Sequence, residues 1–182
     1  ARWAERRQWR RLGIRASRAS LRLRPDDPEM IRRCGLLLSA EDHFGPAIAF
    51  LEKLGPIEGS GDQARLSAME RSYRATGRLD RAADCLRGLY RLSPLARSMG
   101  NRLLDDYLAL GRHAEALELL ETAQLKDSLA RLRLAQELHF RLGHYDEAFE
   151  LVLRLCEYGG EDHEPSIRMD RQLLEAAPQR NG

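Results

Sequence analysis

Histidines and paired carboxylates are the residues of this chain whose types could support catalysis or metal binding. His139 and His144 are five residues apart, so on one helix they would point to different sides, and a turn is expected between them. That spacing does not suit the tight geometry of a zinc site. His163 lies between acidic residues in an expected loop. Two adjacent carboxylate pairs are typical of helix starts or helix surfaces: Asp26-Asp27 and Asp105-Asp106.

Motifs for catalysis are missing from the sequence. It contains no glycine-rich phosphate loop, no HExxH, no CxxC and no GxSxG, and no nucleophile has an identifiable base. Cys34, Cys85 and Cys156 are odd in number and far apart, and each lies in a helical pattern. We therefore expect buried free thiols rather than disulfides. No catalytic residue, metal ligand, cofactor or small-molecule substrate is predicted.

Composition indicates a folded, water-soluble chain. Hydrophobic residues make up 43% and charged residues 32% of the 182 residues, and the net charge is +2. No run of apolar residues is long enough to cross a membrane. All but two of the 30 basic residues are arginine, a bias typical of GC-rich bacterial genomes. Arginine offers a planar fork that matches carboxylates and phosphates.

The first 24 residues are strongly basic. Nine arginines stand against one acid, Glu5, and Trp3 and Trp9 lie among them. This pattern could bind nucleic acid or another anionic surface. It could equally be the polar face of a helix whose acidic partners lie outside this sequence. We favour the second interpretation, because the rest of the chain balances its charge.

A repeated pattern shows which elements must position these side chains. Gly77, Gly111 and Gly143 are each followed, five residues later, by an alanine. The aligned alanines, with Ala47 of a weaker copy in which Asp42 replaces the glycine, are 35, 34 and 32 residues apart: Ala47, Ala82, Ala116 and Ala148. A glycine of this kind ends one helix, and the small alanine lets the next helix approach closely.

Apolar residues continue the pattern after each alanine. A large apolar residue follows four positions later, and three of the repeats have a leucine seven positions later. This is the stripe of a buried helix face. The spacing predicts helix pairs over residues 28–41 and 45–55, 63–76 and 79–92, 96–110 and 113–125, and 128–142 and 145–158.

A period near 34 with glycine and alanine at these positions resembles the tetratricopeptide repeat, or TPR. The resemblance implies an all-α, right-handed solenoid of antiparallel helix pairs. Four repeats are expected at about 27–61, 62–95, 96–127 and 128–160. Residues 1–26 would be a partial, arginine-rich repeat, and 161–182 a helix that begins a fifth repeat or caps the stack. The chain is interpreted as a window from a longer array, so the remainder of its own chain would be a further contact.

In TPR proteins the first helix of each pair lines a concave groove, and the resemblance therefore implies a binding surface on these helices. The partner-binding candidates are mostly arginines: Arg32, Arg33, Arg71, Arg74, Asn101, Arg102, Arg133 and Phe140. They would suit a partner protein with an acidic surface or an acidic peptide. The other interpretation is that these arginines pair with acids of the same chain and bind nothing.

The leading functional hypothesis is a protein-binding scaffold, not an enzyme. The resemblance further implies a bacterial setting, in which such scaffolds recruit an enzyme to an exopolysaccharide export pore in the periplasm. The alternative is a cytoplasmic regulator that binds a peptide, or nucleic acid through its basic start; nucleic acid is the less favoured ligand.

Overall fold

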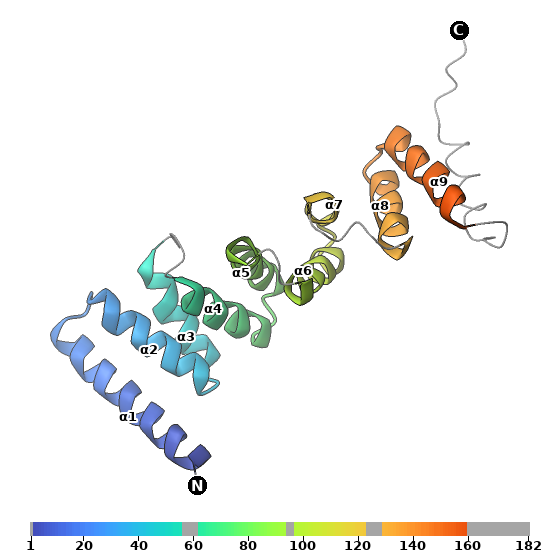
Figure 1. Ribbon diagram of the computed structural model, residues 1–182. Coiled ribbons are helices and arrows are strands. Elements are labelled where there is room, and N and C mark those ends of the chain that lie inside the picture. The colour runs from blue at the N-terminus through green and yellow to red at the C-terminus, as the bar shows by residue number, and fades with distance from the viewer. Residues whose placement is uncertain (1, 56–61, 94–96, 123–128, 160–182) are drawn as a thin grey trace. The chain divides into compact units, whose positions relative to one another are not determined.

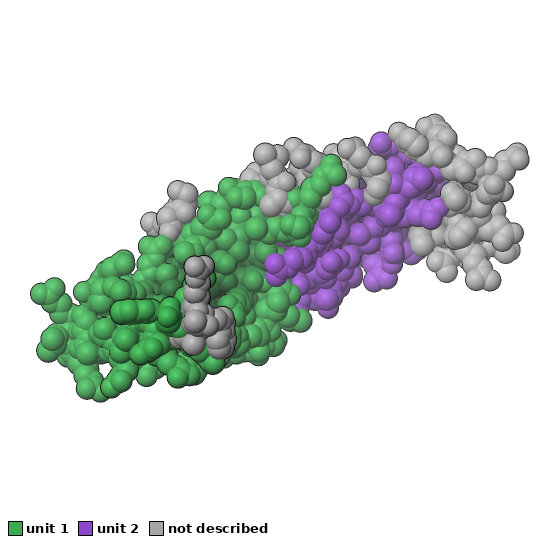
Figure 2. All heavy atoms as spheres, turned by 60° about the horizontal axis from the view of Figure 1, so that its bottom comes forward, with its two compact units in different colours: residues 1–99 green, residues 100–182 purple. Residues whose placement is uncertain are grey.

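A computed structural model describes residues 2–55, 62–93, 97–122 and 129–159. These residues form two compact units, 1–99 and 100–182, which are coloured separately in Figure 2. Helices in the first unit are α1 (Arg2–Leu23), α2 (Pro28–Ala40), α3 (Phe44–Leu51), the short 3₁₀ helix η1 (Glu52–Leu54), α4 (Gln63–Ala75) and α5 (Leu79–Leu92). Helix α6 (Arg97–Ala109) begins at the boundary, and α7 (His113–Thr122), α8 (Leu129–Arg141) and α9 (Tyr145–Gly159) follow.

The helices occur in pairs joined by short turns, as Figure 1 shows. Within the first unit α2 packs on α3 and α4 on α5, while α4 also contacts both helices of the preceding pair. Within the second unit α8 packs on α9, and α7 contacts α8. Short connections force neighbouring helices to run antiparallel. The predicted all-α fold of antiparallel helix pairs is confirmed for the described residues, and the helix bounds lie close to the predicted ones.

Each first helix ends in the same hydrogen-bonded turn. In the second repeat the Arg78 N–H donates to the Tyr73 carbonyl at 2.9 Å and the Gly77 N–H to the Arg74 carbonyl at 3.1 Å. The corresponding pair of bonds closes the other three turns. This is the Schellman arrangement, whose turn residue has a positive φ. The three turn glycines have φ between 69° and 80°, as their spacing predicted.

Asp42 takes this place in the first repeat. Its φ is 63°, and its backbone makes the same bond to Ser39 at 3.2 Å. Aspartate enters the left-handed region more readily than most residues with a side chain. The first repeat therefore has the same turn geometry as the others, although Asp42 replaces the glycine.

The four aligned alanines lie where paired helices touch. Ala47, Ala82, Ala116 and Ala148 are all fully buried, as are Leu51 and Leu86 four positions after the first two. In the first unit Ile14, Cys34, Leu38 and Ala47 form one cluster, joined by Phe50 and two leucines. The glycine and alanine periodicity therefore marks the helix contacts, and Cys34 and Cys85 are buried free thiols as expected.

Two polar contacts fix α4 against the preceding pair. Ser39 and Ser72 are buried, and their hydroxyls lie 3.0 Å apart where α2 meets α4. The buried guanidinium of Arg65 donates to the carbonyls of Leu51 and Gly55, at 2.9 and 2.6 Å. Arg65 thus satisfies carbonyls at the end of α3 and η1 that have no helical partner. The sequence patterns did not predict a buried arginine here.

Residues 2–23 form one continuous helix, α1, which packs on α2. Gly13 lies at that contact, because a Cβ built on it would be 2.9 Å from a methyl group of Leu37. The placement agrees with a second helix of a preceding pair, but the repeat boundaries, including residues 1–26, remain predictions. The expected C-terminal helix within 161–182 lies outside the described residues.

Candidate functional site

Solvent-facing rows run along three of the first helices. Residues spaced by four lie on one face of a helix. In α4, α6 and α8 these rows are, in chain order, Ser67-Arg71-Ala75, Asn101-Asp105-Ala109 and Arg133-Glu137-Arg141. Their members are exposed except for Glu137, which is half-buried. Three of the partner-binding candidates lie on these rows, namely Arg71, Asn101 and Arg133, and each unit carries at least one complete row.

Two arginines of the first unit are held by acids of the same chain. Arg71 donates to Asp42 at 2.5 Å, and its guanidinium lies 5.7 Å from the centre of the Phe44 ring. Arg74 donates to Glu70 at 2.7 Å, one turn earlier on α4. Pairing within the chain therefore accounts for these two side chains, in agreement with the alternative considered from the sequence.

Arg33 of α2 and Arg133 of α8 differ from them. Both side chains are exposed, and among the described residues neither has an ion-pair or hydrogen-bond partner. Arg32 is half-buried, and Arg102 is exposed and engaged in a contact of its own. Arg33 and Arg133 are consequently the candidates whose donors are available to another molecule.

Two further candidates are engaged inside the second unit. Asn101 accepts a hydrogen bond from Arg131 at 2.6 Å, which ties α6 to α8. Phe140 packs against the buried Ala148 and Val152, and its ring meets that of Tyr145 edge-on at 5.6 Å. Phe140 therefore lies in the contact between α8 and α9 rather than on the exposed row.

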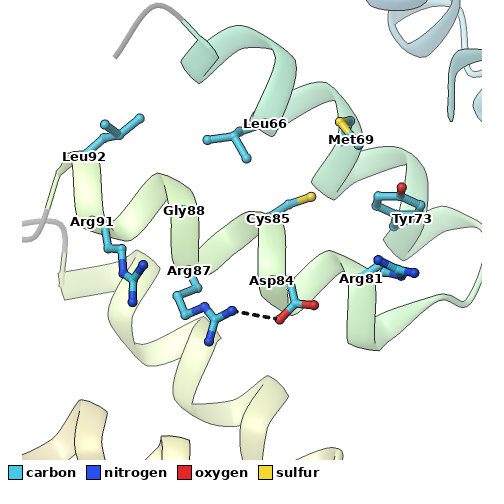
Figure 3. Close-up of a pocket in the computed structure, with 10 residues that line it drawn as sticks. All are labelled: Leu66, Met69, Tyr73, Arg81, Asp84, Cys85, Arg87, Gly88, Arg91 and Leu92. Carbon is cyan, nitrogen blue, oxygen red and sulfur yellow. Dashed lines mark hydrogen bonds and ion pairs between the residues drawn. The ribbon is translucent and has the colours of Figure 1, made fainter. Parts of the chain in front are cut away.

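A hollow of about 420 Å³ lies along α4 and α5 and was not found from the sequence (Figure 3). Leu66, Met69, Tyr73 and Cys85 contribute to its lining. Basic side chains of α5 also line it: Arg81, Arg87 and Arg91, with Asp84 paired to Arg87 at 3.5 Å. The hollow has an apolar floor edged by arginines, and no sequence motif marks it because its residues come from two helices.

The chemistry of this hollow does not suit nucleophilic catalysis. Burial, helped by Asp84 and Glu70, raises the pKa of the Cys85 thiol to about 11, so the thiol is protonated near neutral pH. Burial also raises the pKa of Tyr73, whose hydroxyl donates to Glu52 at 2.7 Å. Both groups act as parts of the packing.

His139 and His144 lie closer together than their spacing predicted. Their rings are 5.7 Å apart, because the turn after α8 folds back and the His144 N–H donates to the His139 carbonyl at 2.9 Å. The Nε2 atom of His139 is 3.6 Å from a carboxylate oxygen of Glu121. No group of three potential metal ligands converges within the described parts of the chain. His163 lies outside them.

Three N-terminal arginines have an acidic partner within the chain. Arg7, Arg10 and Arg11 approach the buried carboxylate of Glu41 at 3.3, 3.6 and 4.0 Å. The expectation that the acidic partners lie outside this sequence is therefore wrong for these three. The partner could not be found from the sequence, because Glu41 follows α2 and is about thirty residues away.

Comparison with known proteins gives no family assignment. No described protein family matches the sequence, and no curated protein matches it. Solved structures with a similar arrangement include MamA, at 18% identity over 87% of this chain and 89% of that one, with a TM-score of 0.47. A second is YrrB, named as a TPR protein with an unusual peptide-binding site (17% identity, 91% and 94% covered, TM-score 0.43). A third is a thermophilic TPR protein of Thermus thermophilus (19% identity, 90% and 88% covered, TM-score 0.39).

The fold assignment rests on the helix pairs and turns of this chain. Structural similarities with TM-scores below 0.5 add nothing to it. Separately, no helix among the described residues has the length and apolar character that crossing a membrane requires.

Proposed function

We propose that this chain is a protein-binding scaffold whose first helices carry the partner surface. The observations that support the proposal are the solvent-facing rows on α4, α6 and α8, and the available side chains of Arg133, on the α8 row, and of Arg33, on α2. Paired helices hold such side chains on a rigid support, and a rigid support lowers the entropic cost of binding.

The proposed partner is acidic where it meets this surface. A guanidinium with unused donors can form two parallel bonds to one carboxylate, and such charge-assisted bonds are about twice as strong as neutral ones. Arg33 belongs to the first unit and Arg133 to the second. A partner with two acidic segments could therefore engage each unit separately and gain affinity from the connection between them.

A narrower proposal concerns the setting. A scaffold of this kind in a bacterial exopolysaccharide export complex would bring a polysaccharide-modifying enzyme to an export pore. This setting rests on the sequence resemblance and the arginine bias alone. Co-purification of the chain with both proteins from export-competent cells would support it, and recovery with cytoplasmic partners only would exclude it.

The alternative is a regulator that binds nucleic acid through α1. Arg6, Arg15 and Arg22 are exposed on this helix and favour it. Binding to phosphodiesters would weaken steeply with salt, by a slope close to the number of phosphates neutralised. A shallow salt dependence would exclude this function.

Charge reversal tests the scaffold proposal. We expect Arg33→Glu and Arg133→Glu each to weaken binding of the co-purified partner at least about tenfold, because like charges then face each other. Arg154→Glu is the matched control, since this exposed arginine lies on the second helix α9. Calorimetric titration measures the affinities, and circular dichroism checks the helix content. If the control lost as much affinity as the two test variants, the first helices would be excluded as the partner surface.

A further inference from the structure

The start of α1 and the turn between α2 and α3 enclose a hollow of about 310 Å³. Its lining is almost entirely charged. Three of the lining residues, Arg6, Arg7 and Arg10, come from α1, and Arg71 comes from α4. The other three are Ala40, at the end of α2, and Glu41 and Asp42 in the turn that follows. Four guanidinium groups from two helices that are far apart in the sequence therefore line the same hollow.

Two acidic residues do not neutralise this cluster. Glu41 is buried and is shared among Arg7, Arg10 and Arg11, while Asp42 pairs with Arg71. Four arginines against two carboxylates leave the lining with a net charge of +2. Among the described residues Arg6 has no ion-pair or hydrogen-bond partner at all. The lining of the hollow thus carries more positive than negative charge.

Hydrogen bonds to a backbone carbonyl and to Glu41 hold two of these arginines in place. Arg10 Nη1 donates to the Ala40 carbonyl at 3.1 Å, and Arg7 Nε donates to Glu41 Oε2 at 3.3 Å. A guanidinium has five N–H donors, and Arg6 uses none of them on other described residues, so the lining offers donors to a bound anion. Because the side chains are already oriented, less conformational entropy is lost when the anion binds.

We propose that this hollow binds a phosphomonoester. Such a group carries close to two negative charges near neutral pH and has three acceptor oxygens, which match the charge and the donors of the lining. A single carboxylate would neutralise only half of the excess. A phosphodiester backbone carries one charge per group and runs along a surface, whereas this hollow suits a terminal group that enters end-on.

The site is distinct from the proposed partner surface, with which it shares only Arg71. It also differs from the nucleic-acid function considered for α1, because it requires a terminal dianion. Variants at Arg6 and Asp42 leave Arg33 and Arg133 unchanged, so this proposal and the scaffold proposal can fail independently.

The test is calorimetric titration of the full chain with a phosphoserine peptide, the same peptide with serine or glutamate, and inorganic phosphate, all at one ionic strength. We expect the phosphoserine peptide to bind, the glutamate peptide to bind at least about tenfold more weakly, and the serine peptide not to bind. If inorganic phosphate binds as tightly as the phosphopeptide, the ligand is a free phosphate compound. If the phosphopeptide binds more tightly, the ligand is a phosphorylated protein segment.

Three variants assign the binding to this site. Arg6→Gln should weaken phosphopeptide binding several-fold, whereas Arg15→Gln, an exposed arginine elsewhere on α1, should leave it unchanged. Asp42→Asn should strengthen it, because a competing charge is removed while asparagine tolerates the positive φ. Gained affinity cannot result from unfolding. The proposal is overturned if the parent binds neither probe, if Arg6→Gln binds like the parent, or if short duplex DNA binds more tightly than the phosphopeptide.

Discussion

Individual small residues decide how closely the helices of a pair approach. A Cβ at Gly35 would lie 2.6 Å from two side-chain atoms of Leu51, and Leu51 is fully buried and cannot move aside. We expect Gly35→Ala to lower the free energy of unfolding by about 1–3 kcal/mol through overpacking. Thermal and urea denaturation followed by circular dichroism measures the change.

Gly45→Ala is the matched control, because nothing lies within 4 Å of the added methyl group and the residue is exposed on α3. Alanine is the better helix former, so this variant should be unchanged or more stable by up to about 1 kcal/mol. If Gly35→Ala were as stable as Gly45→Ala, the contact with Leu51 would not limit the residue at position 35.

The buried Cys85 thiol makes stability depend on alkaline pH. Its pKa is raised to about 11 in the native chain, whereas an unfolded cysteine titrates near 8.5. As the pH rises between these values, the unfolded chain loses the proton and the native chain keeps it, so the free energy of unfolding falls. From about pH 8.5 to 10.5 it should fall by roughly 2 kcal/mol more in the parent than in Cys85→Ala. Urea denaturation at each pH measures this free energy. If it fell equally with pH in the parent and in Cys85→Ala, the pKa of the thiol would not be raised in the native chain.

At the scale of the elements, the aligned alanines allow second helices to pack on first helices. Ala116 is fully buried in α7, while Ala114 on the same helix is exposed. Ala116→Leu should cost about 1–3 kcal/mol, because the added volume forces the packed helices apart. Ala114→Leu adds the same atoms on the solvent side and should change stability by less than about 0.5 kcal/mol. The reverse order in denaturation experiments would mean that the buried face of α7 is misassigned.

The helices could be predicted because their signals are local. The glycine that ends a first helix and the alanine five residues later lie close together in the sequence. The apolar stripe that follows the alanine has the period of a helix. The structure keeps this pattern even where Asp42 replaces glycine. Helix existence, order and approximate bounds therefore follow from neighbours in the sequence.

Pairing between distant residues could not be predicted from such signals. Arg65 is buried because two backbone carbonyls need its donors, although arginine is usually placed on the surface. Arg71 meets Asp42 across 29 positions, and Glu41 gathers three arginines of α1. Candidate residues for a partner surface could be named from the sequence, but only the packed helices show which of the arginines are already engaged.

At the scale of the whole molecule, the repeat places similar solvent-facing rows in both units. Each unit therefore offers its own polar surface, and one partner can bind both when its segments are linked at a suitable distance. The scaffold proposal thereby gives a chain with few chemical motifs a specific function. In that proposal, recognition comes from positions repeated on rigid helices, each of which contributes a modest amount.

The most direct test of the scaffold account is photo-crosslinking from four exposed alanines, each replaced in turn by a benzophenone amino acid. Ala75 and Ala109 lie on the solvent-facing rows of first helices α4 and α6, and Ala49 and Ala114 lie on second helices α3 and α7. In native cells, Ala75 and Ala109 should crosslink to the same partner, and the Arg33→Glu and Arg133→Glu changes together should abolish both products. Ala49 and Ala114 should give no such product. A partner captured from Ala49 and Ala114, but from neither first-helix position, would contradict the account.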